Sequence, residues 1–287
     1  MTLKLDLHVH SVSNGKTHID CDQLKESLLK KGLHGVAITN FFDISHALLL
    51  KEQLKEFIII VGQEVWTKDG HLIGLGLKER VTDFLSAEET IGHIHEQGGI
   101  AIAPHPYLFV SFCLGEKVTS LPVDAVEVYN GLAGGLIVPN FLAKRAARKM
   151  KVPQVASTDT TDVSAIGQSY TEILVENPNR ILEAIRGGQV KLHKRALPLP
   201  FAFVFKGLFY SSNIAPCSVH SFPCLVCGKT MAVRMFKDKR PCLDCGKEEW
   251  TRIVCCTNEH FLCLECVVKR NLAMYLDSEF KVESERK

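Results

Sequence analysis

Short apolar runs alternate with amphipathic helical runs over residues 1–195, and this alternation constrains the fold more than any other feature of the chain. Gly35–Thr39 and Phe57–Gly62 are continuous apolar runs, which are typical of strands covered on both faces. Before these runs, Cys21–Lys31 has leucines on one helical face, and between them Ser45 is placed to cap a helix that extends to Glu56. Alternating units of this length predict a parallel sheet, and their number favours a closed or nearly closed α/β barrel.

Composition and charge exclude several classes of protein. The chain has 287 residues, 46% of them hydrophobic, which is too apolar for a disordered chain. Its 34 basic and 32 acidic side chains give a formal net charge of +2, so bulk attraction to nucleic acid is not expected. Residues 1–10 carry charges where a signal peptide needs an apolar core, and Leu197–Tyr210 is too short to span a bilayer. We therefore expect a cytoplasmic protein with no membrane partner.

Eight of the 11 cysteines lie between Cys224 and Cys266, and their spacing predicts zinc binding. Paired C-x2-C knuckles are the usual source of four thiolates for a tetrahedral structural zinc. The spacing leaves open whether the ligands fill two sites in sequence or interleaved, and whether Cys255 or Cys256 is a ligand. We expect one or two structural zinc ions, with ligands drawn from Cys224, Cys227, Cys242, Cys245, Cys256, His260, Cys263 and Cys266.

Changes in composition along the chain predict four segments. Residues 1–195 form the barrel, and residues 196–216 form a basic and aromatic connector. Residues 217–275 form a small, zinc-ribbon-like domain, and residues 276–287 form a charged tail. A zinc ribbon beside a basic connector keeps a nucleic acid or a protein as a possible partner of the second half.

Side chains of metal-binding type lie where the predicted strands of the barrel end. Because the carboxyl ends of barrel strands meet on one face, groups far apart in the sequence come together there. An H-x-H pair on a strand places both imidazoles on the same side, which suits two ligands of one ion. Burying so many ionisable groups without a cation would be costly, so a metal site is predicted. Its candidates are His8, His10, Glu64, His71, His105 and Asp159.

The motifs DLHVHS, GLHGVAITN, GQEV, HLIGLGL, GGIAIAPHP, DAVEVYN and ASTDT, in this order over residues 5–161, resemble those of the PHP (polymerase and histidinol phosphatase) family. The resemblance implies a distorted (β/α)7 TIM-like barrel, up to three metal ions and hydrolysis of phosphate esters. It implies one ion held by His8, His10, Glu64 and Asp159, and a second held by the bridging Glu64 with His71 and His105. It also implies that Glu64, Asp159 and His105 are the catalytic residues.

The positions that would hold a third ion in the PHP family carry Asn14, Phe41 and Thr161 here. The losses fall on one ion and spare the ligands of the other two. We therefore expect a dinuclear centre of Mn, Zn or Fe with metal-bound hydroxide as the nucleophile. Asp6 is a candidate acceptor of the ring N–H of a metal-binding histidine, a contact that fixes the imidazole tautomer.

Three further residues lie near the vanished third site. Lys16 or His18 is placed to offset the missing ion, and His46 is a candidate displaced ligand. The reading favoured for Lys16 and His18 is that of solvated loop residues, and a structural role is favoured over metal binding for His46.

The sequence therefore predicts metal-dependent hydrolysis of a small phosphomonoester or a nucleotide. The cysteine-rich domain, which resembles an uncharacterised domain of some archaeal proteins, would dock or select the substrate. Two alternatives stay open: a catalytically weak barrel that binds a phosphorylated ligand or a protein, and an exonuclease that acts on nucleic acid. The exonuclease predicts strongly salt-dependent binding that needs residues 217–287.

Overall fold

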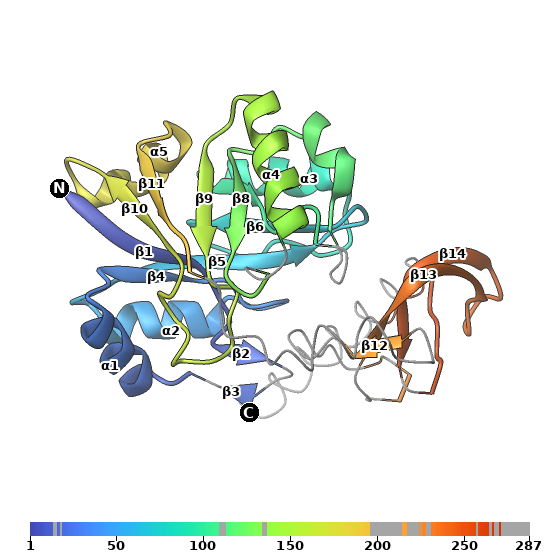
Figure 1. Cartoon of the computed structure of the whole chain (residues 1–287). Coiled ribbons are helices and arrows are strands. Elements are labelled where there is room, and N and C mark those ends of the chain that lie inside the picture. Colours follow the sequence, from blue (N-terminus) through green and yellow to red (C-terminus); the bar gives the residue numbers. More distant parts are fainter. Residues whose placement is uncertain are drawn as a thin grey trace. The chain divides into compact units, whose positions relative to one another are not determined.

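The computed structural model divides the chain into two compact units, Met1–Pro200 and Phe201–Lys287 (Figure 1). The predicted connector is described only at residues 214–216, and the predicted tail lies outside the described residues. Among the helices that are described, none combines the length and the apolar character needed to cross a membrane. The structure describes residues 1–13, 16–17, 19–108, 113–133, 137–195, 214–216, 224, 226–227, 231–256, 258–263, 266 and 270.

Nine strands of the described first unit form one sheet in the order β11-β10-β1-β4-β5-β6-β7-β8-β9. The sheet is nearly closed, because the amide of Asp159 donates to the carbonyl of His8 and the amide of His10 donates to the carbonyl of Thr160, each at 2.9 Å. The predicted barrel-like α/β fold is thus confirmed. The strands are β1 (Thr2–Val9), β4 (Gly35–Ile38), β5 (Ile58–Trp66), β6 (His71–Leu75), β7 (Ile100–Ala103), β8 (Ala125–Asn130), β9 (Gln154–Ser157), β10 (Tyr170–Leu174) and β11 (Val190–His193).

The sheet is mixed, and the prediction of a parallel sheet is wrong for two strands. Strand β6 runs antiparallel to β5 and β7, and β10 runs antiparallel to β1 and β11. Only residues 67–70 join β5 to β6, and a connection this short permits only an antiparallel pair. The reversal places the start of β6 beside the end of β5, with Trp66 opposite His71.

Five helices of the described residues accompany the sheet, and their ends follow local signals. Helix α1 begins at a capping box between Asp20 and Gln23 and ends at Gly32, whose φ of 61° is left-handed. Ser45 is not the cap of α2: Ile44 takes that position, and the Ser45 amide donates to Asp43 at 3.0 Å. The helices are α1 (Cys21–Lys31), α2 (Ser45–Gln53), α3 (Ala87–Glu96), α4 (Ile137–Met150) and α5 (Ile181–Arg186).

The shorter elements complete the described chain. Two 3-10 turns, η1 (Gly115–Ser120) and η2 (Pro178–Arg180), and a small antiparallel pair, β2 (Val12–Ser13) with β3 (Lys16–Thr17), belong to the first unit. The second unit contains an antiparallel sheet in the order β12-β13-β14. Its strands are β12 (Ile214–Pro216), β13 (Met231–Pro241) and β14 (Glu248–Cys256).

Strand β1 separates apolar from metal-binding side chains. Leu3, Leu5 and Leu7 belong to one buried hydrophobic cluster. Because successive side chains of a strand point to opposite faces, Asp6 and His8 lie on the other face of β1. Both of these polar residues are completely buried. The same alternation that builds the core therefore also presents the polar residues of the site.

The pairing of β4 with β5 requires glycine at position 35. A Cβ atom on Gly35 would lie 2.0 Å from the carbonyl oxygen of Ile58. Such an overlap forces the strands apart, so we expect Gly35→Ala to lower the free energy of unfolding by about 1–3 kcal/mol or more. Gly92→Ala in α3 is the control, because a Cβ there meets nothing within 4 Å. This substitution should raise the free energy of unfolding by about 0.5–1 kcal/mol. Urea denaturation followed by circular dichroism measures both changes, and equal effects would contradict the argument.

Candidate metal centre

All six predicted metal-binding residues of the barrel lie together at one end of its strands. Two groups share Glu64, and within each group one possible ligand atom per residue lies within 4.8 Å of all the others. Each of the six residues is at most 4% exposed. His71 reaches the group because the reversed strand β6 starts where β5 ends. The first group is His8, His10, Glu64 and Asp159, and the second is Glu64, His71 and His105.

The carboxylate of Glu64 lies between the two groups and offers one oxygen to each. Its Oε2 lies 3.0 Å from Nε2 of His8 and 3.0 Å from Nε2 of His10. Its Oε1 lies 2.8 Å from Nδ1 of His71 and 3.0 Å from Nε2 of His105. Each oxygen of this carboxylate therefore faces a different group of possible ligand atoms.

The distances between ligand atoms fit a metal ion. Nε2 of His8 lies 3.2 Å from Nε2 of His10. Two nitrogens that each lie roughly 2.0–2.1 Å from one tetrahedral ion are about 3.3 Å apart. Oδ1 of Asp159 lies 3.3 Å from Nε2 of His8 and so belongs to the same cluster of donor atoms. Imidazole nitrogens with carboxylate oxygens form a donor set for Zn, Mn or Fe.

The cluster attracts positive charge. Burial alone would raise the pKa of Glu64, but the charges of His8 and His71 outweigh it and hold that pKa well below its usual range. Burial alone would lower the pKa of His8, but the carboxylates of Asp159 and Glu64 raise it well above its usual value. Ionised carboxylates at this depth need compensating charge, which protons or divalent ions can supply.

Two of the six residues have a left-handed backbone. His105 has φ of 29° and Asp159 has φ of 58°, a region that residues with a Cβ atom seldom adopt. Hydrogen bonds hold both, because the His105 amide donates to Oε2 of Glu127 at 2.8 Å and the Asp159 amide donates to the carbonyl of His8. Such conformations persist at functional sites where the surroundings impose them.

Glu127 and Asn130 are buried beside the centre, and neither is among the residues predicted to have a role there. Burial raises the pKa of Glu127, but the charge of His8 outweighs it and holds that pKa below its usual value. Both lie in the motif DAVEVYN. A carboxylate and an amide inside an apolar strand are the only signal by which they could have been found.

The hydrogen-bond partners of the Asp6 carboxylate differ from the imidazole that was expected. Asp6 accepts hydrogen bonds from the amide and the hydroxyl of Thr158, at 3.0 and 2.5 Å, and from the amide of Gly167 at 2.9 Å. Burial raises the pKa of Asp6 to about 6. Asp6 therefore holds the segment that leads into Asp159.

The positions near the predicted third site differ in what they contact. The ring of Phe41 lies 4.8 Å from that of His10 and 5.5 Å from that of His71, measured between centroids. His46 Nδ1 lies 2.7 Å from the hydroxyl of Ser11 and is in neither ligand group. Thr161 is half-buried and follows Asp159 by two residues. Asn14, His18 and the side chain of Lys16 lie outside the described residues.

The cysteine-rich unit contains two clusters of possible ligands, and they are interleaved in the sequence. Cys242, Cys245, Cys263 and Cys266 form one cluster, and Cys224, Cys227 and His260 form the other. The arrangement in sequence order, left open by the spacing, is therefore not the one adopted. The side chains of Cys255 and Cys256 lie outside the described residues.

The thiols of the four-cysteine cluster differ in acidity, because burial raises the pKa of Cys263 and of Cys266. Burial raises the pKa of Cys242, but hydrogen bonds from the backbone of Cys263 and Cys245 outweigh it and lower that pKa to about 6. Sγ of Cys245 lies 3.6 Å from Sγ of Cys263. Four sulfurs this close, with one of them readily ionised, fit a tetrahedral zinc site.

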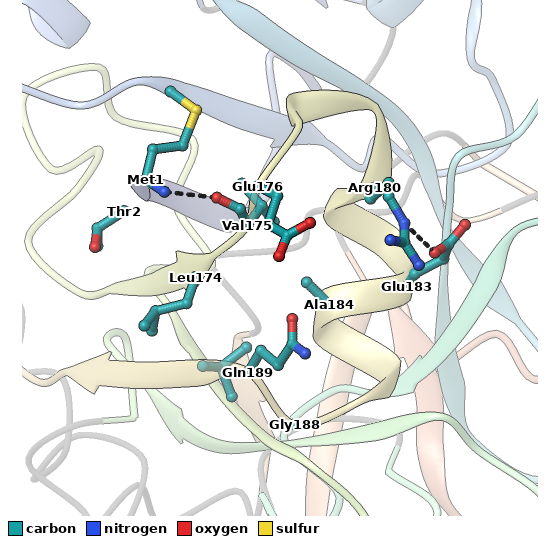
Figure 2. Close-up of a pocket in the computed structure, with 11 residues that line it drawn as sticks. Met1, Thr2, Leu174, Val175, Glu176, Arg180, Glu183, Ala184, Gly188 and Gln189 are labelled. Atoms are coloured by element: carbon teal, nitrogen blue, oxygen red, sulfur yellow. Dashed lines mark hydrogen bonds and ion pairs between the residues drawn. The ribbon is translucent and has the colours of Figure 1, made fainter.

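A cavity of about 720 Å³ lies between residues of β1, β10 and α5 (Figure 2). It is lined by Met1, by Thr2 at the start of β1, by Leu174 at the end of β10, and by Glu183 and Ala184 of α5. His8 and His10 lie at the opposite end of β1. The cavity contains none of the six ligand candidates, so we do not assign it to catalysis.

Comparison with known proteins identifies the family. A family model described as PHP-associated matches residues 138–190. The chain is 37% identical over 166 residues to an uncharacterized protein of Methanocaldococcus jannaschii, an alignment that covers 54% of this chain and 96% of that protein. The chain belongs to the PHP family. A second uncharacterized protein of that organism is 28% identical over 187 residues, which is 62% of this chain and 74% of that protein.

Solved structures share the PHP fold of this chain. A two-domain protein from Bacteroides vulgatus, described as containing a predicted PHP-like metal-dependent phosphoesterase, superposes with a TM-score of 0.58 at 16% identity. That match covers 88% of this chain and 86% of the other. PsfC from Pseudomonas syringae superposes with a TM-score of 0.54 at 15% identity, over 74% of this chain and 98% of the other. At these identities the likeness shows the fold alone.

Proposed function

We propose that this PHP protein is a metal-dependent phosphoesterase that hydrolyses a small phosphomonoester or a nucleotide at a two-metal centre. One observation carries the proposal: each carboxylate oxygen of Glu64 faces a separate group of buried ligands. His8, His10 and Asp159 would hold one ion with Glu64, and His71 and His105 would hold the other. Divalent ions at these positions supply positive charge for the phosphoryl oxygens and lower the pKa of a bound water.

The residues of the chain fix where this chemistry takes place. Glu64 sets the separation of the two ligand groups, because its two oxygens belong to one rigid carboxylate. His105 and Asp159 have left-handed backbones, and their side chains reach Glu64 and His8, respectively. Complete burial of Glu64 strengthens each electrostatic contact within the cluster.

Phe41 supports a centre of two ions and not three. An apolar ring cannot ligate a metal, and this ring contacts the imidazoles of His10 and His71. In the PHP pattern this position belongs to the third ion. The lost ligand is therefore replaced by a side chain that packs against ligands of both proposed ions.

The manganese content of the full-length protein measures how many ions the barrel binds. Mn²⁺ prefers ligand sets that contain carboxylate oxygens, whereas thiolates prefer zinc, so manganese reports the barrel separately from the cysteine clusters. We expect close to two manganese ions per chain by elemental analysis, together with phosphate release from an aryl phosphate or from one of a panel of nucleotides. Three ions would overturn the dinuclear centre. Binding of phosphate esters without turnover in Mn²⁺, Zn²⁺ or Fe²⁺ would instead establish the phospho-ligand-binding alternative.

We further propose that the two cysteine clusters hold structural zinc and that the second unit docks or selects the substrate. Cys242, Cys263 and Cys266 are buried. A structural zinc site has no open position for a substrate, so the burial of these cysteines supports a structural site.

A further inference from the structure

Glu127 is a buried carboxylate that belongs to neither group of proposed ligands. It is 1% exposed and lies in β8. Its Oε1 lies 3.2 Å from Nδ1 of His8 and also accepts a hydrogen bond from the hydroxyl of Ser157. Its Oε2 accepts from the amide of His105 at 2.8 Å and from Nδ2 of Asn130 at 2.9 Å. One carboxylate thus receives donors from four segments of the barrel.

We infer that Glu127 is a positioning residue that orients ligands of both metal ions, an inference that rests on the proposed two-metal centre. A carboxylate only accepts hydrogen bonds, so Nδ1 of His8 carries the proton. Nε2 of His8 then presents its lone pair to the ion, on the side where it meets Glu64 and His10. Outer carboxylates commonly fix the tautomer and the ring orientation of metal-binding histidines in this way.

Asn130 extends the influence of Glu127 to Asp159. Its Nδ2 donates to Oε2 of Glu127 at 2.9 Å and to Oδ2 of Asp159 at 2.8 Å. The oxygen Oδ1 of Asp159 then faces Nε2 of His8 at 3.3 Å, within the first ligand group. The contact with the His105 amide reaches the second group. Glu127 is therefore connected to ligands proposed for both ions.

The hydrogen bonds require a carboxylate at position 127. Each of its two oxygens receives two donors. A glutamine has one acceptor oxygen, and its NH2 group would face two donors whichever way the amide is turned. Buried donors left without an acceptor are costly, so Glu127→Gln should disturb the ligands that they belong to.

Glu127→Gln in the full-length protein tests the inference. We expect its affinity for Mn²⁺ to fall by about 10–100-fold, the usual effect of losing an outer partner of a metal ligand. Asp83→Asn is the matched control, because Asp83 is also a buried carboxylate but bonds to Gln63, Trp66 and Arg80. Its affinity should equal that of the natural chain. Glu127→Asp, which keeps both acceptor oxygens, should fall between the two and carries the test if the glutamine variant does not fold.

A spectroscopic measurement separates positioning from a general structural effect. In the zinc-loaded natural protein, the Nδ1 proton of His8 should resonate far downfield because it bonds to a carboxylate. In Glu127→Gln it should move upfield, whereas in Asp83→Asn it should not move. Natural-like affinity and an unmoved proton in Glu127→Gln would overturn the inference while manganese binding by the natural chain stands. Failure of the natural chain to bind manganese would overturn the proposed function itself, and this inference with it.

Discussion

Glu64→Gln loses phosphate-ester hydrolysis and its second manganese ion. Removing a hydrogen-bond partner of a metal ligand already lowers activity by up to about a hundredfold. Because Glu64 is itself a proposed ligand, we expect turnover to fall by more than about a hundredfold. The reason is the division of the carboxylate, whose Oε2 faces His8 and His10 while its Oε1 faces His71 and His105. An amide has one acceptor oxygen and no negative charge, so it cannot join the two groups. Steady-state kinetics and manganese analysis on the same samples measure both effects.

Glu79→Gln provides the control for this experiment. Glu79 is exposed and lies outside both ligand groups, so its removal should change neither turnover nor manganese content. If Glu64→Gln kept two manganese ions and natural turnover, Glu64 would not be a bridging ligand, and the two-metal proposal would be wrong.

Cys263→Ser should lose one zinc ion per chain and unfold the second unit. Cys263 is 1% exposed and lies in the cluster with Cys242, Cys245 and Cys266. Structural zinc contributes roughly 10–16 kcal/mol of apparent binding free energy, which is also folding free energy in small zinc domains. Serine keeps the shape of the side chain but is a poor zinc ligand. Native mass spectrometry counts the zinc, and limited proteolysis reports the folding of the unit after residue 200.

Cys113→Ser is the matched control for the zinc experiment. Cys113 is a half-buried thiol of the first unit and belongs to neither cysteine cluster. This variant should keep all its zinc, and both variants should keep manganese in the barrel. An unchanged zinc count in Cys263→Ser would show that the four-cysteine cluster does not hold zinc.

The strand ends were predictable because local pattern determines them. An apolar run followed by a histidine or a carboxylate marks both the strand and the polar residue at its end, as in His8, His105 and Asp159. The antiparallel direction of β6 could also have been predicted, because only four residues separate Trp66 from His71. The regular β/α alternation elsewhere favoured a parallel strand instead.

The partners of the buried carboxylates could not be predicted from the sequence. Asp6 lies two residues from His8 in the sequence, yet it bonds to Thr158 and Gly167. Glu127 lies 119 residues from His8 and contacts its ring. Strand pairing and closure of the barrel decide such contacts, and no single segment contains that information. The cysteine clusters were ambiguous for the same reason, because each C-x2-C knuckle has the same local geometry.

The packing of Trp66 against His71 gives the protein a built-in optical reporter. The two rings lie 4.5 Å apart between centroids. An indole this close to an imidazole senses any change in the charge of that imidazole, so its emission should change when an ion binds at His71. The chain has two tryptophans, and replacing Trp250 by phenylalanine leaves Trp66 as the single indole fluorophore. Loading of the barrel with metal can then be timed by stopped-flow fluorescence without a substrate.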